Sequence, residues 1–355
     1  MNARPRRKPA AGDPLLARMG AAPEADVDAP HLVAVSGGRD SVALLHLLLA
    51  SGYRCLIVCH LDHALRAESA AEARFVAQLA ERASIPFFSR RIQVASLAQR
   101  DALSIETAAR IARHRFFAAA ARKFATPRVF LAHHADDQAE TFLLKLFRGA
   151  GARGLGAMRR VQELRIGSTT LTLHRPLLDV WRSEIDAYIA RHQLAYCEDS
   201  SNADPDPQRN RLRLELLPLL QQHFGRSLPR ILHRTAATLR DEDDLLRSLI
   251  PKPAPQLSVP ELKALHPALQ RRTLRAWLEQ AQIPNISFDL IESVRSLLSS
   301  STAKVNLPGG SHARRRSKLL FLQHPALTPQ AAAPLPRTKT GKRSHASGTV
   351  TRGEP

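Results

Sequence analysis

The segment from His31 to Leu48 constrains the fold of this chain more than any other, because it predicts a strand, a turn and a helix in immediate succession. The run Leu32-Val33-Ala34-Val35 is wholly apolar and predicts a buried strand. The turn is Ser36-Gly37-Gly38-Arg39-Asp40-Ser41, and the residues after it are apolar at helical spacing. Unpaired backbone N–H groups and the positive end of a helix dipole converge on such a turn, so the sequence predicts an anion site there.

The turn departs from the common nucleotide-binding loop. It lacks the lysine of the pattern G-x-x-x-x-G-K-[ST], which disfavours an ordinary P-loop NTPase. Arg39 stands in place of that lysine, and Asp40 offers a carboxylate for Mg²⁺ or for orienting the loop. The alternative interpretation is that Asp40 or Ser41 only caps the following helix.

Strands and helices alternate along the next hundred residues. Further strands are expected at Cys55–His60, Pro86–Val94 and Val129–Ala132, with helices at Ser69–Arg82 and from Ser104 to about Phe124. This alternation predicts an α/β protein with a doubly wound parallel sheet. Ligands bind beyond the carboxyl ends of the strands in such sheets. Polar clusters follow three of the expected strands, namely Ser36–Ser41, His60–Arg66 and His133–Glu140.

The third cluster is acidic. A helix that begins near Asp136 places Asp136, Asp137 and Glu140 at neighbouring positions on its surface. Such carboxylates can hold Mg²⁺ or accept hydrogen bonds from a substrate ammonium group. The alternative is helix-start chemistry, because Asp137-x-x-Glu140 resembles a capping box. A zinc site is disfavoured, since His133 and His134 lack the i, i+4 spacing of a helical zinc pair.

The charge balance points to a polyanionic partner. Lysine and arginine total 52 against 32 acidic residues, which gives a net charge of +20, and such a field favours nucleic acid. The 3 cysteines are too few for a disulfide framework and indicate reduced thiols. No apolar run is long enough for a membrane span. We therefore expect a cytoplasmic protein that does not bind membranes.

Composition divides the chain into four parts. Residues 1–28 are expected to be a flexible basic extension, unstructured or loosely helical, and residues 29–222 the α/β domain that carries the anion-binding turn. Residues 226–323 predict a mainly helical domain, closed by a basic hairpin (Lys304–Leu307 and Arg314–Leu322) that suits a polyanion. Residues 324–355 are rich in Ala, Pro, Thr, Lys and Arg and are expected to be a disordered basic tail.

The ordered set of motifs identifies a family. The turn Ser36–Ser41 resembles the PP-loop signature of ATP pyrophosphatases, whose fold is that of adenine nucleotide alpha hydrolases. With the later motifs, the chain resembles the tRNA(Ile)-lysidine synthetase family. Those motifs are His60–Arg66, Glu106–Arg110, His133–Thr141, Arg148–Gly151, Arg175–Leu178 and Arg209–Arg213.

The resemblance implies a ligase reaction that uses ATP and Mg²⁺. ATP would adenylate the C2 carbonyl oxygen of the wobble cytidine in an isoleucine tRNA with a CAU anticodon. The ε-amine of free L-lysine would then displace AMP, which changes codon specificity from AUG to AUA. Homodimer formation is left open, and larger family members carry a further C-terminal domain that helps to hold the tRNA acceptor stem.

The resemblance also implies roles for particular residues. The candidate catalytic acids are Asp40, Asp136, Asp137 and Glu140, with Asp40 as a ligand of Mg²⁺. The candidate ATP-binding residues are Ser36, Gly37, Gly38, Arg39, Asp40, Ser41, His60 and Asp62. The candidate contacts to phosphate or tRNA are Arg110, His133, Arg209, Arg211, Arg314 and Arg315.

Two alternatives remain beside this interpretation. The first is another PP-loop tRNA-modifying enzyme, such as a 2-thiocytidine synthetase, which would use cysteines for sulfur chemistry. Cys55 and Cys59 lie in an expected buried strand, which disfavours that reading. The second is a non-catalytic basic RNA-binding protein. The combination of Asp40, Asp137 and Glu140 speaks against it, although helix capping explains part of that set.

Overall fold

The computed structural model describes residues 13–19, 26–64, 69–197, 207–252, 254–300 and 303–323. Its contacts divide the chain into two compact units, Met1–Ser248 and Leu249–Pro355. The expected tail at 324–355 lies outside the described residues, as does Arg66 of the second motif. No described helix is both long enough and apolar enough to cross a membrane.

The first unit is built on a mixed six-stranded sheet with the strand order β3-β2-β1-β4-β6-β5. Its strands are β1 (His31–Ala34), β2 (Leu56–Asp62), β3 (Phe87–Arg91), β4 (Arg128–Phe130), β5 (Val161–Ile166) and β6 (Thr169–His174). The first five strands in this order run parallel, whereas β5 pairs antiparallel with β6. The predicted parallel α/β sheet is confirmed, with an antiparallel edge that we did not predict.

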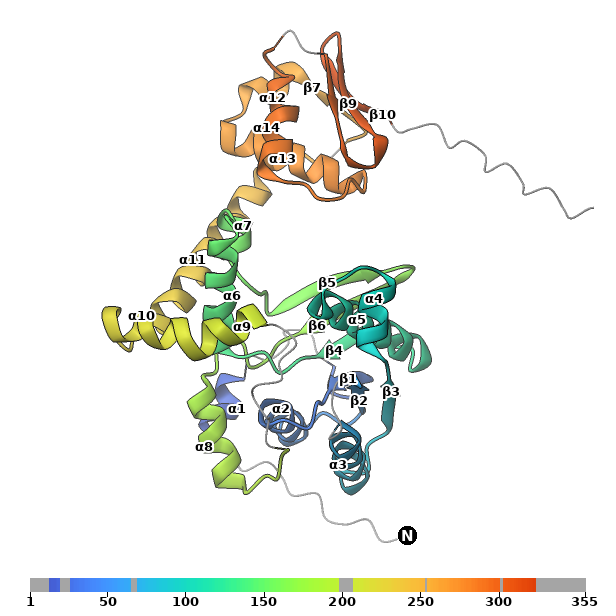
Figure 1. Cartoon of the computed structure of the whole chain (residues 1–355), viewed down its shortest axis with the longest axis vertical. Coiled ribbons are helices and arrows are strands. Elements are labelled where there is room, and N and C mark those ends of the chain that lie inside the picture. The colour runs from blue at the N-terminus through green and yellow to red at the C-terminus, as the bar shows by residue number, and fades with distance from the viewer. Residues whose placement is uncertain are drawn as a thin grey trace, which may run out of the picture. The chain divides into compact units, whose positions relative to one another are not determined.

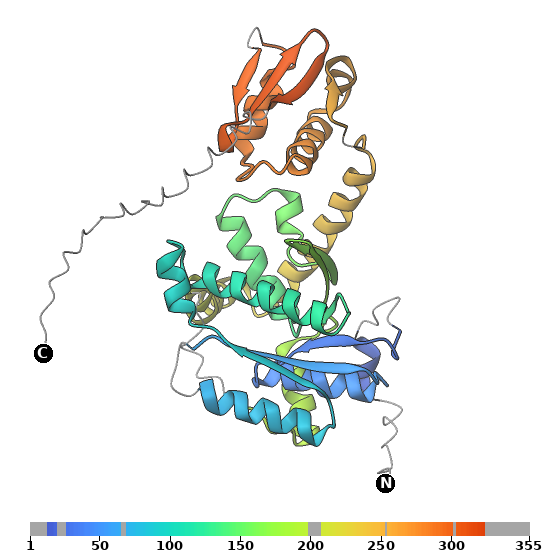
Figure 2. The same cartoon turned by 90° about the vertical axis from the view of Figure 1, so that its right-hand side faces the viewer.

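Helices cover both faces of this sheet, which explains why its central strands are apolar on both sides (Figures 1 and 2). Val33 packs in a core with α2 (Arg39–Ala50), α3 (Ser69–Arg82) and α8 (Arg182–His192). Leu32, the preceding residue of β1, packs on the opposite face with Phe116 and Phe117. These two come from the helix α5 (Ile105–Lys123). Successive strand side chains point to opposite faces, so both β1 positions must be apolar.

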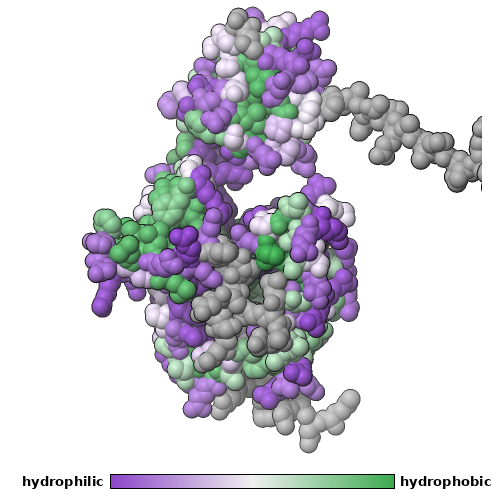
Figure 3. Space-filling model, in the orientation of Figure 1, coloured by the Kyte–Doolittle hydropathy of each residue, from purple (hydrophilic) through white to green (hydrophobic). Residues whose placement is uncertain are grey.

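The other helices of this unit are α4 (Val94–Arg100), α6 (Ala135–Phe147), α7 (Ala152–Leu155), α9 (Pro207–Arg211), a π-helix (Leu212–Leu216), α10 (Leu217–Phe224) and α11 (Leu228–Ser248). Phe142 and Leu143 of α6 share a core with Ala236 of α11. This packing places α11 in the first unit, whereas the sequence assigned residues from 226 onward to the C-terminal domain. Large apolar side chains are exposed on α10, where Figure 3 shows a hydrophobic patch.

The N-terminal extension contains an element whose bounds the sequence analysis did not predict. A short helix, α1, spans Pro14–Arg18, and the Asp13 side chain accepts a hydrogen bond from the Leu15 backbone N–H at 2.9 Å. Leu15 and Met19 are buried in the core formed with α2 and α8. The helix agrees with the loosely helical alternative expected for residues 1–28, but two apolar side chains bind this segment to the core.

The second unit combines helices with an antiparallel sheet of the order β7-β10-β9-β8. Its elements are β7 (Gln256–Ser258), α12 (Val259–Ala264), α13 (Pro267–Gln280), α14 (Phe288–Ser296), β8 (Lys304–Asn306), a 3-10 turn (Pro308–Gly310), β9 (His312–Arg316) and β10 (Leu319–Gln323). Trp277, Val294 and Leu320 form part of its core. The segment Arg314–Leu322 was expected to form one arm of a basic hairpin. It forms parts of the two strands β9 and β10 instead, because the chain turns at Ser317, whose φ is +56°.

Candidate active site

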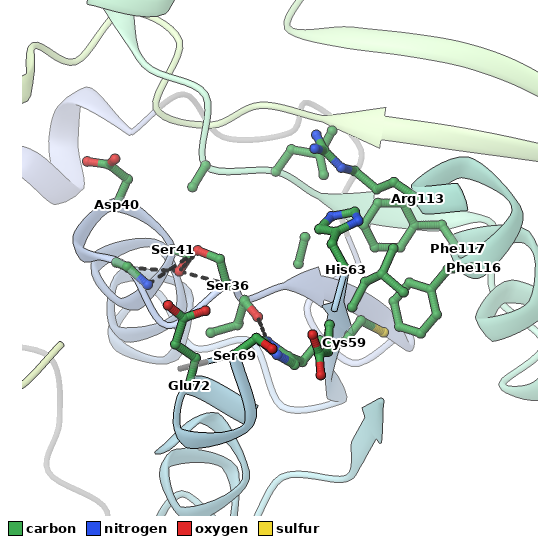
Figure 4. Close-up of a pocket in the computed structure, with 18 of the residues that line it drawn as sticks. Ser36, Asp40, Ser41, Cys59, His63, Ser69, Glu72, Arg113, Phe116 and Phe117 are labelled. Carbon is green, nitrogen blue, oxygen red and sulfur yellow. Dashed lines mark hydrogen bonds between the residues drawn. The ribbon is translucent and has the colours of Figure 1, made fainter. Parts of the chain in front are cut away.

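The turn after β1 is closed by hydrogen bonds between its own serines (Figure 4). Ser41 Oγ donates to the Gly38 carbonyl at 2.8 Å and lies 3.2 Å from the Ser36 N–H, which donates to it. The Gly38 N–H points to Ser36 Oγ at 3.3 Å. Gly38 is the N-cap of α2 and has no side-chain cap. The first turn of α2 therefore presents backbone N–H groups without a capping side chain, which suits an anion.

Gly37 is required at its position by both conformation and space. Its φ is +99°, a region that L side chains rarely adopt. A Cβ built on Gly37 would lie 3.3 Å from Cγ2 of Val76 in α3. The backbone of the turn thus lies close against α3 at the mouth of the site.

Asp40 is held through one of its carboxylate oxygens. Arg182 Nη1, from the first turn of α8, donates to Asp40 Oδ2 at 2.8 Å, and His134 Nε2 lies 3.8 Å from the same oxygen. Oδ1 is buried without a hydrogen-bond partner among the described residues. Burial raises the pKa of Asp40 despite the opposing charges of His134 and Arg182. Asp40 does not act as a helix cap, so the cap-only interpretation fails for this residue.

The turn forms one end of a cavity of about 390 Å³ at the carboxyl edge of the sheet. Ser36, Gly38, Asp40 and Ser41 line this polar end. The opposite part is lined by the side chains of Cys59, Leu61, Phe116, Phe117 and Leu131. A cavity with a phosphate-binding turn at one end and apolar walls at the other has the shape and chemistry for a nucleotide.

The predicted residues His60 and Asp62 lie in the same cavity. His60 Nδ1 donates to the Val35 carbonyl at 2.9 Å, which leaves its buried Nε2 without a partner among the described residues. Asp62 Oδ1 accepts a hydrogen bond from the Ala64 N–H at 2.7 Å, and Oδ2 lies 3.3 Å from Arg91 Nε. Asp62 therefore shapes the loop after β2, while His60 presents a ring nitrogen near the cavity.

The acidic cluster lies at the start of α6, where expected. Asp137 Oδ2 accepts a hydrogen bond from the His134 N–H at 3.0 Å, so helix capping is part of its role. Asp136 Oδ2 accepts one from the Arg182 N–H at 2.8 Å. Burial disfavours a charged His134, yet Asp137, Asp136 and Asp40 together raise the pKa of its imidazole. One histidine thus joins three carboxylates from α2 and α6.

Two arginines, one from α9 and one from the π-helix that follows it, neutralise this cluster. Arg209 Nε donates to Glu140 Oε2 at 2.8 Å, and Arg213 Nε donates to Glu140 Oε1 at 2.6 Å. The Nη2 groups of both arginines reach Asp137 Oδ1 at 3.4 and 3.3 Å. Although burial opposes it, His134 and Arg209 lower the pKa of Asp137 to about 2. Glu140 is 2% exposed, so its charge is matched inside the protein.

The other predicted residues have different positions. Arg39 Nη1 donates to Asp186 Oδ1 of α8 at 2.6 Å, and its guanidinium lies over the Tyr196 ring. Arg110 is exposed on α5, and the Arg211 side chain is 79% exposed beside Glu215. Arg314 and Arg315 belong to the second unit. There Arg314 donates to Gln323, and Arg315 donates to the carbonyls of Leu297 and Ser300, which follow α14.

Several residues of the site were missed. Arg113 lines the cavity in place of Arg110, and the helical spacing of Arg113, Phe116 and Phe117 was the available signal. His63 also lines the cavity, and burial lowers its pKa to about 4. Arg213 belongs to the motif Arg209–Arg213. Its pairing with Glu140 could not be predicted, because only the tertiary fold brings the two residues together.

The cavity suits a magnesium ion beside a bound phosphate. No group of three or more metal-binding side chains occurs in the described part of the chain. Asp40 Oδ1, however, is a buried carboxylate oxygen without a partner in the cavity wall. Mg²⁺ is usually held by one or two carboxylates together with substrate phosphates. The donor set therefore fits a magnesium ion that binds with the nucleotide.

Comparison with known proteins agrees with this geometry. Residues 17–220 match a family model described as a PP-loop domain, and residues 257–320 match a TilS substrate binding domain. A tRNA(Ile)-lysidine synthase from Thermosynechococcus vestitus is 34% identical over 311 residues, which cover 84% of this chain and 87% of that protein. The chain belongs to the tRNA(Ile)-lysidine synthase family.

Other members of the tRNA(Ile)-lysidine synthase family are longer. The protein from Geobacter sulfurreducens is 40% identical over 295 residues, which cover 78% of this chain and 61% of that protein. The protein from Thermus thermophilus is 38% identical, and the match covers 58% of its length. This chain thus spans about three fifths of the length of these two relatives.

A solved structure supports the fold. The U34-tRNA thiolase NcsA from Methanococcus maripaludis aligns with a TM-score of 0.50 at 12% identity, over 63% of this chain and 76% of that one. At this identity the likeness shows the fold alone. The predicted PP-loop architecture is confirmed.

Proposed function

We propose that this protein is a tRNA(Ile)-lysidine synthetase that ligates L-lysine to the wobble cytidine of CAU-anticodon isoleucine tRNA. The observation that carries the proposal is a cavity that ends in a closed phosphate-binding turn and has Asp40 in its wall, with His134 of the acidic cluster 3.8 Å from the Asp40 carboxylate. Family membership supplies the substrates. The net charge of +20 supports a polyanionic partner.

The reaction has two steps. In the first, the cytosine O2 attacks the α-phosphorus of ATP, an O–P bond forms and pyrophosphate leaves. In the second, the lysine ε-amine attacks C2, a C–N bond forms and AMP leaves. The turn Ser36–Ser41 would bind the departing pyrophosphate through backbone N–H groups. Mg²⁺ held by Asp40 would neutralise charge on the phosphates.

The acids at the start of α6 divide into two groups. Asp137 and Glu140 are already paired with arginine side chains, whereas none of the described arginine side chains pairs with Asp136, whose side chain is 34% exposed. Asp136 is therefore our candidate for contact with the lysine amine. Arg209 and Arg213 would hold the acids in place, and the surface arginines Arg110, Arg211 and Arg314 are our candidates for tRNA phosphates.

The sulfur-transfer alternative lacks support from Cys55 and Cys59. Cys59 lines the cavity, but burial raises the pKa of its thiol to about 12, so it is not a thiolate. Cys55 is exposed at the start of β2. Free lysine, ATP and tRNA meet in the cytoplasm, where we place the reaction.

The decisive experiment incubates the full-length protein with radiolabelled lysine, ATP, Mg²⁺ and a transcript of the isoleucine tRNA. We expect ATP-dependent label in the RNA, with one AMP and one pyrophosphate released per lysine. A transcript with uridine at the wobble position is the control and should remain unlabelled. Absence of label, or label that does not need ATP, would refute the proposal.

A further inference from the structure

His133 and Arg175 meet at the carboxyl edge of the sheet, although they lie far apart in the sequence. The strands β4 and β6 are parallel neighbours with Phe130 opposite His174, so the residues that follow them lie side by side. Arg175 Nε lies 3.3 Å from His133 Nδ1. His133 lines the nucleotide cavity, whereas Arg175 does not, so Arg175 reaches the site through its contact with His133.

Arg175 is held in one orientation by neutral groups. It is 6% exposed, and its Nη1 donates to the Arg159 carbonyl at 2.8 Å. Its Nη2 donates to Gln162 Oε1 at 3.0 Å. Gln162 of β5, the Arg159 carbonyl two residues before β5, and His133 thus fix all three directions of the guanidinium fork. A guanidinium is planar and rigid, so these contacts determine where Nε points.

The contact with His133 can have only one direction. A guanidinium has donors and no acceptor, so Arg175 donates and His133 Nδ1 accepts. A ring nitrogen that accepts carries no proton, which places the proton of the neutral imidazole on Nε2. Burial also lowers the pKa of His133 to about 3; Asp137 opposes this shift, whereas Arg175, Arg209 and Arg113 act in the same direction as burial. The ring is therefore neutral, with its N–H on the side away from Arg175.

We propose that Arg175 is a positioning residue that fixes His133 as a hydrogen-bond donor to a phosphate oxygen of the bound nucleotide. Among the described residues, Nε2 of His133 has no hydrogen-bond partner, so this N–H is left for a ligand in the cavity. The inference rests on the proposed function for the identity of the ligand. A donor that stays neutral and prealigned stabilises developing negative charge without reorganisation.

His60 provides an internal reference for the His133 tautomer, because its Nδ1 is a donor where that of His133 is an acceptor. Its Nδ1 donates to the Val35 carbonyl at 2.9 Å, so its neutral ring has the lone pair on Nε2. Both histidines line the same cavity. Two neighbouring imidazoles with opposite tautomers can be compared in a single spectrum.

The first test is nitrogen-15 NMR of the full-length protein labelled at its histidine rings, with assignments from His133→Gln and His60→Gln spectra. We expect protonation at Nε2 for His133 and at Nδ1 for His60. Proton location on Nδ1 of His133 would overturn the inference. This measurement needs neither lysine nor tRNA, so its outcome is independent of the proposed function. In Arg175→Met, we expect the His133 proton to be shared between both nitrogens, whereas a purely structural Arg175 would leave the tautomer unchanged.

The second test compares variants of His133 in lysidine formation. The amide nitrogen of a glutamine reaches where Nε2 lies, so His133→Gln should keep kcat within about threefold. His133→Leu removes the donor and should lower kcat about a hundredfold, with a smaller change in KM for ATP. Equal losses in both variants would contradict a donor role. Arg175→Gln covers the case in which Arg175→Met does not fold: its amide can either donate or accept, so it should show the tautomer change with a weaker loss of kcat.

Discussion

At the scale of single residues, Asp40 combines one satisfied and one unsatisfied oxygen. Oδ2 is held by Arg182, whereas Oδ1 is buried with no partner among the described residues. A buried carboxylate oxygen without a partner is unfavourable, which is why burial raises the pKa of Asp40. A cation that arrives with a nucleotide would remove this penalty.

Asp40→Asn should therefore lose lysidine formation by more than about a hundredfold, because the amide cannot neutralise a cation. Filter-binding affinity for tRNA should stay within about twofold, since Asp40 lies in the nucleotide cavity. Asp101→Asn, at an exposed site on the same unit, is the matched control. An unchanged rate in Asp40→Asn would assign Asp40 a structural role.

Glu140 should matter for stability as well as for activity. Glu140→Ala leaves Arg209 and Arg213 without their main partner, and we expect a loss of about 2 kcal/mol in unfolding free energy, since both guanidiniums keep some solvent contact. Urea denaturation of wild type and variant measures this difference in unfolding free energy. Glu215→Ala removes an exposed pair at 3.9 Å and should change stability by less than about 0.5 kcal/mol. Equal effects would contradict the buried network.

Residue identities could be predicted where a local motif carries them. The sequence pointed to both Asp137 and Arg209, but not to their contact, because 72 residues separate them and only the tertiary fold joins them. Arg39 illustrates the reverse case. Its place in the loop suggested a phosphate contact, whereas the nearby Asp186 carboxylate binds its guanidinium.

At the scale of elements, α2 and α8 are joined by two reciprocal ion pairs. Arg39 of α2 pairs with Asp186 of α8, and Arg182 of α8 pairs with Asp40 of α2. The Tyr188 hydroxyl lies 2.7 Å from Nδ1 of His46 further along both helices. These contacts hold the start of α2, and with it the turn Ser36–Ser41.

The turn itself can be tested with a pair of glycines. Gly37→Ala introduces strain at a φ of +99° and a contact with Val76, so we expect ATP affinity to fall at least about tenfold. Gly52→Ala has a similar φ of +90° with open space around the new Cβ. It should cost about 1 kcal/mol of stability and leave ATP binding unchanged. Calorimetric titration with ATP measures the affinity of both variants. Equal ATP affinities would contradict a role for the turn in nucleotide binding.

The ion pair that joins His233 of α11 to Asp179 depends on pH. Hydrogen bonding to His233 of α11, together with Arg160, lowers the pKa of Asp179 from 3.8 to about 2. The contribution of the Asp179 carboxylate to the free energy of unfolding is therefore fully present above pH 3.8 and is lost as the pH falls through 2. The difference in unfolding free energy between wild type and Asp179→Asn should shrink over that interval. A difference independent of pH would exclude this linkage.

Elements with strong periodicity could be predicted, and those held by tertiary contacts could not. The helix at Ser69–Arg82 matches the prediction at both ends. The hairpin β5–β6 was missed because only Leu171 and Leu173 of its twelve positions are buried, and those two belong to β6. The helix α1 was missed because its five residues have no periodicity of their own and depend on Leu15.

At the scale of the whole molecule, excess positive charge dominates. The chain carries a net charge of +20, and exposed arginines occur in both units, such as Arg110 and Arg314. Fixed positive charge attracts RNA from a distance and weakens with added salt. The homodimer left open by the sequence stays a prediction, which light scattering of the full-length protein would test.

Affinity for tRNA should therefore fall steeply with salt. Because phosphate contacts release counterions, six or more contacts would reduce affinity by about a thousandfold between roughly 50 and 200 mM salt. Fluorescence titration with the full-length protein measures the slope, and Arg110→Ala should make it shallower. A flat response would refute the assignment of a polyanionic partner.

The balance of charge around Glu140 has a consequence for the nucleophile. Asp137 and Glu140 contribute two negative charges, and Arg209 and Arg213 contribute two positive ones. Of the three acids at the start of α6, Asp136 alone would then face an arriving ammonium ion without an arginine side chain, so the amine loses its proton more readily than beside three bare carboxylates. Only the free base has the lone pair that attacks carbon. In the proposed reaction, the two arginines would thus govern how basic the incoming lysine remains, rather than how tightly it binds.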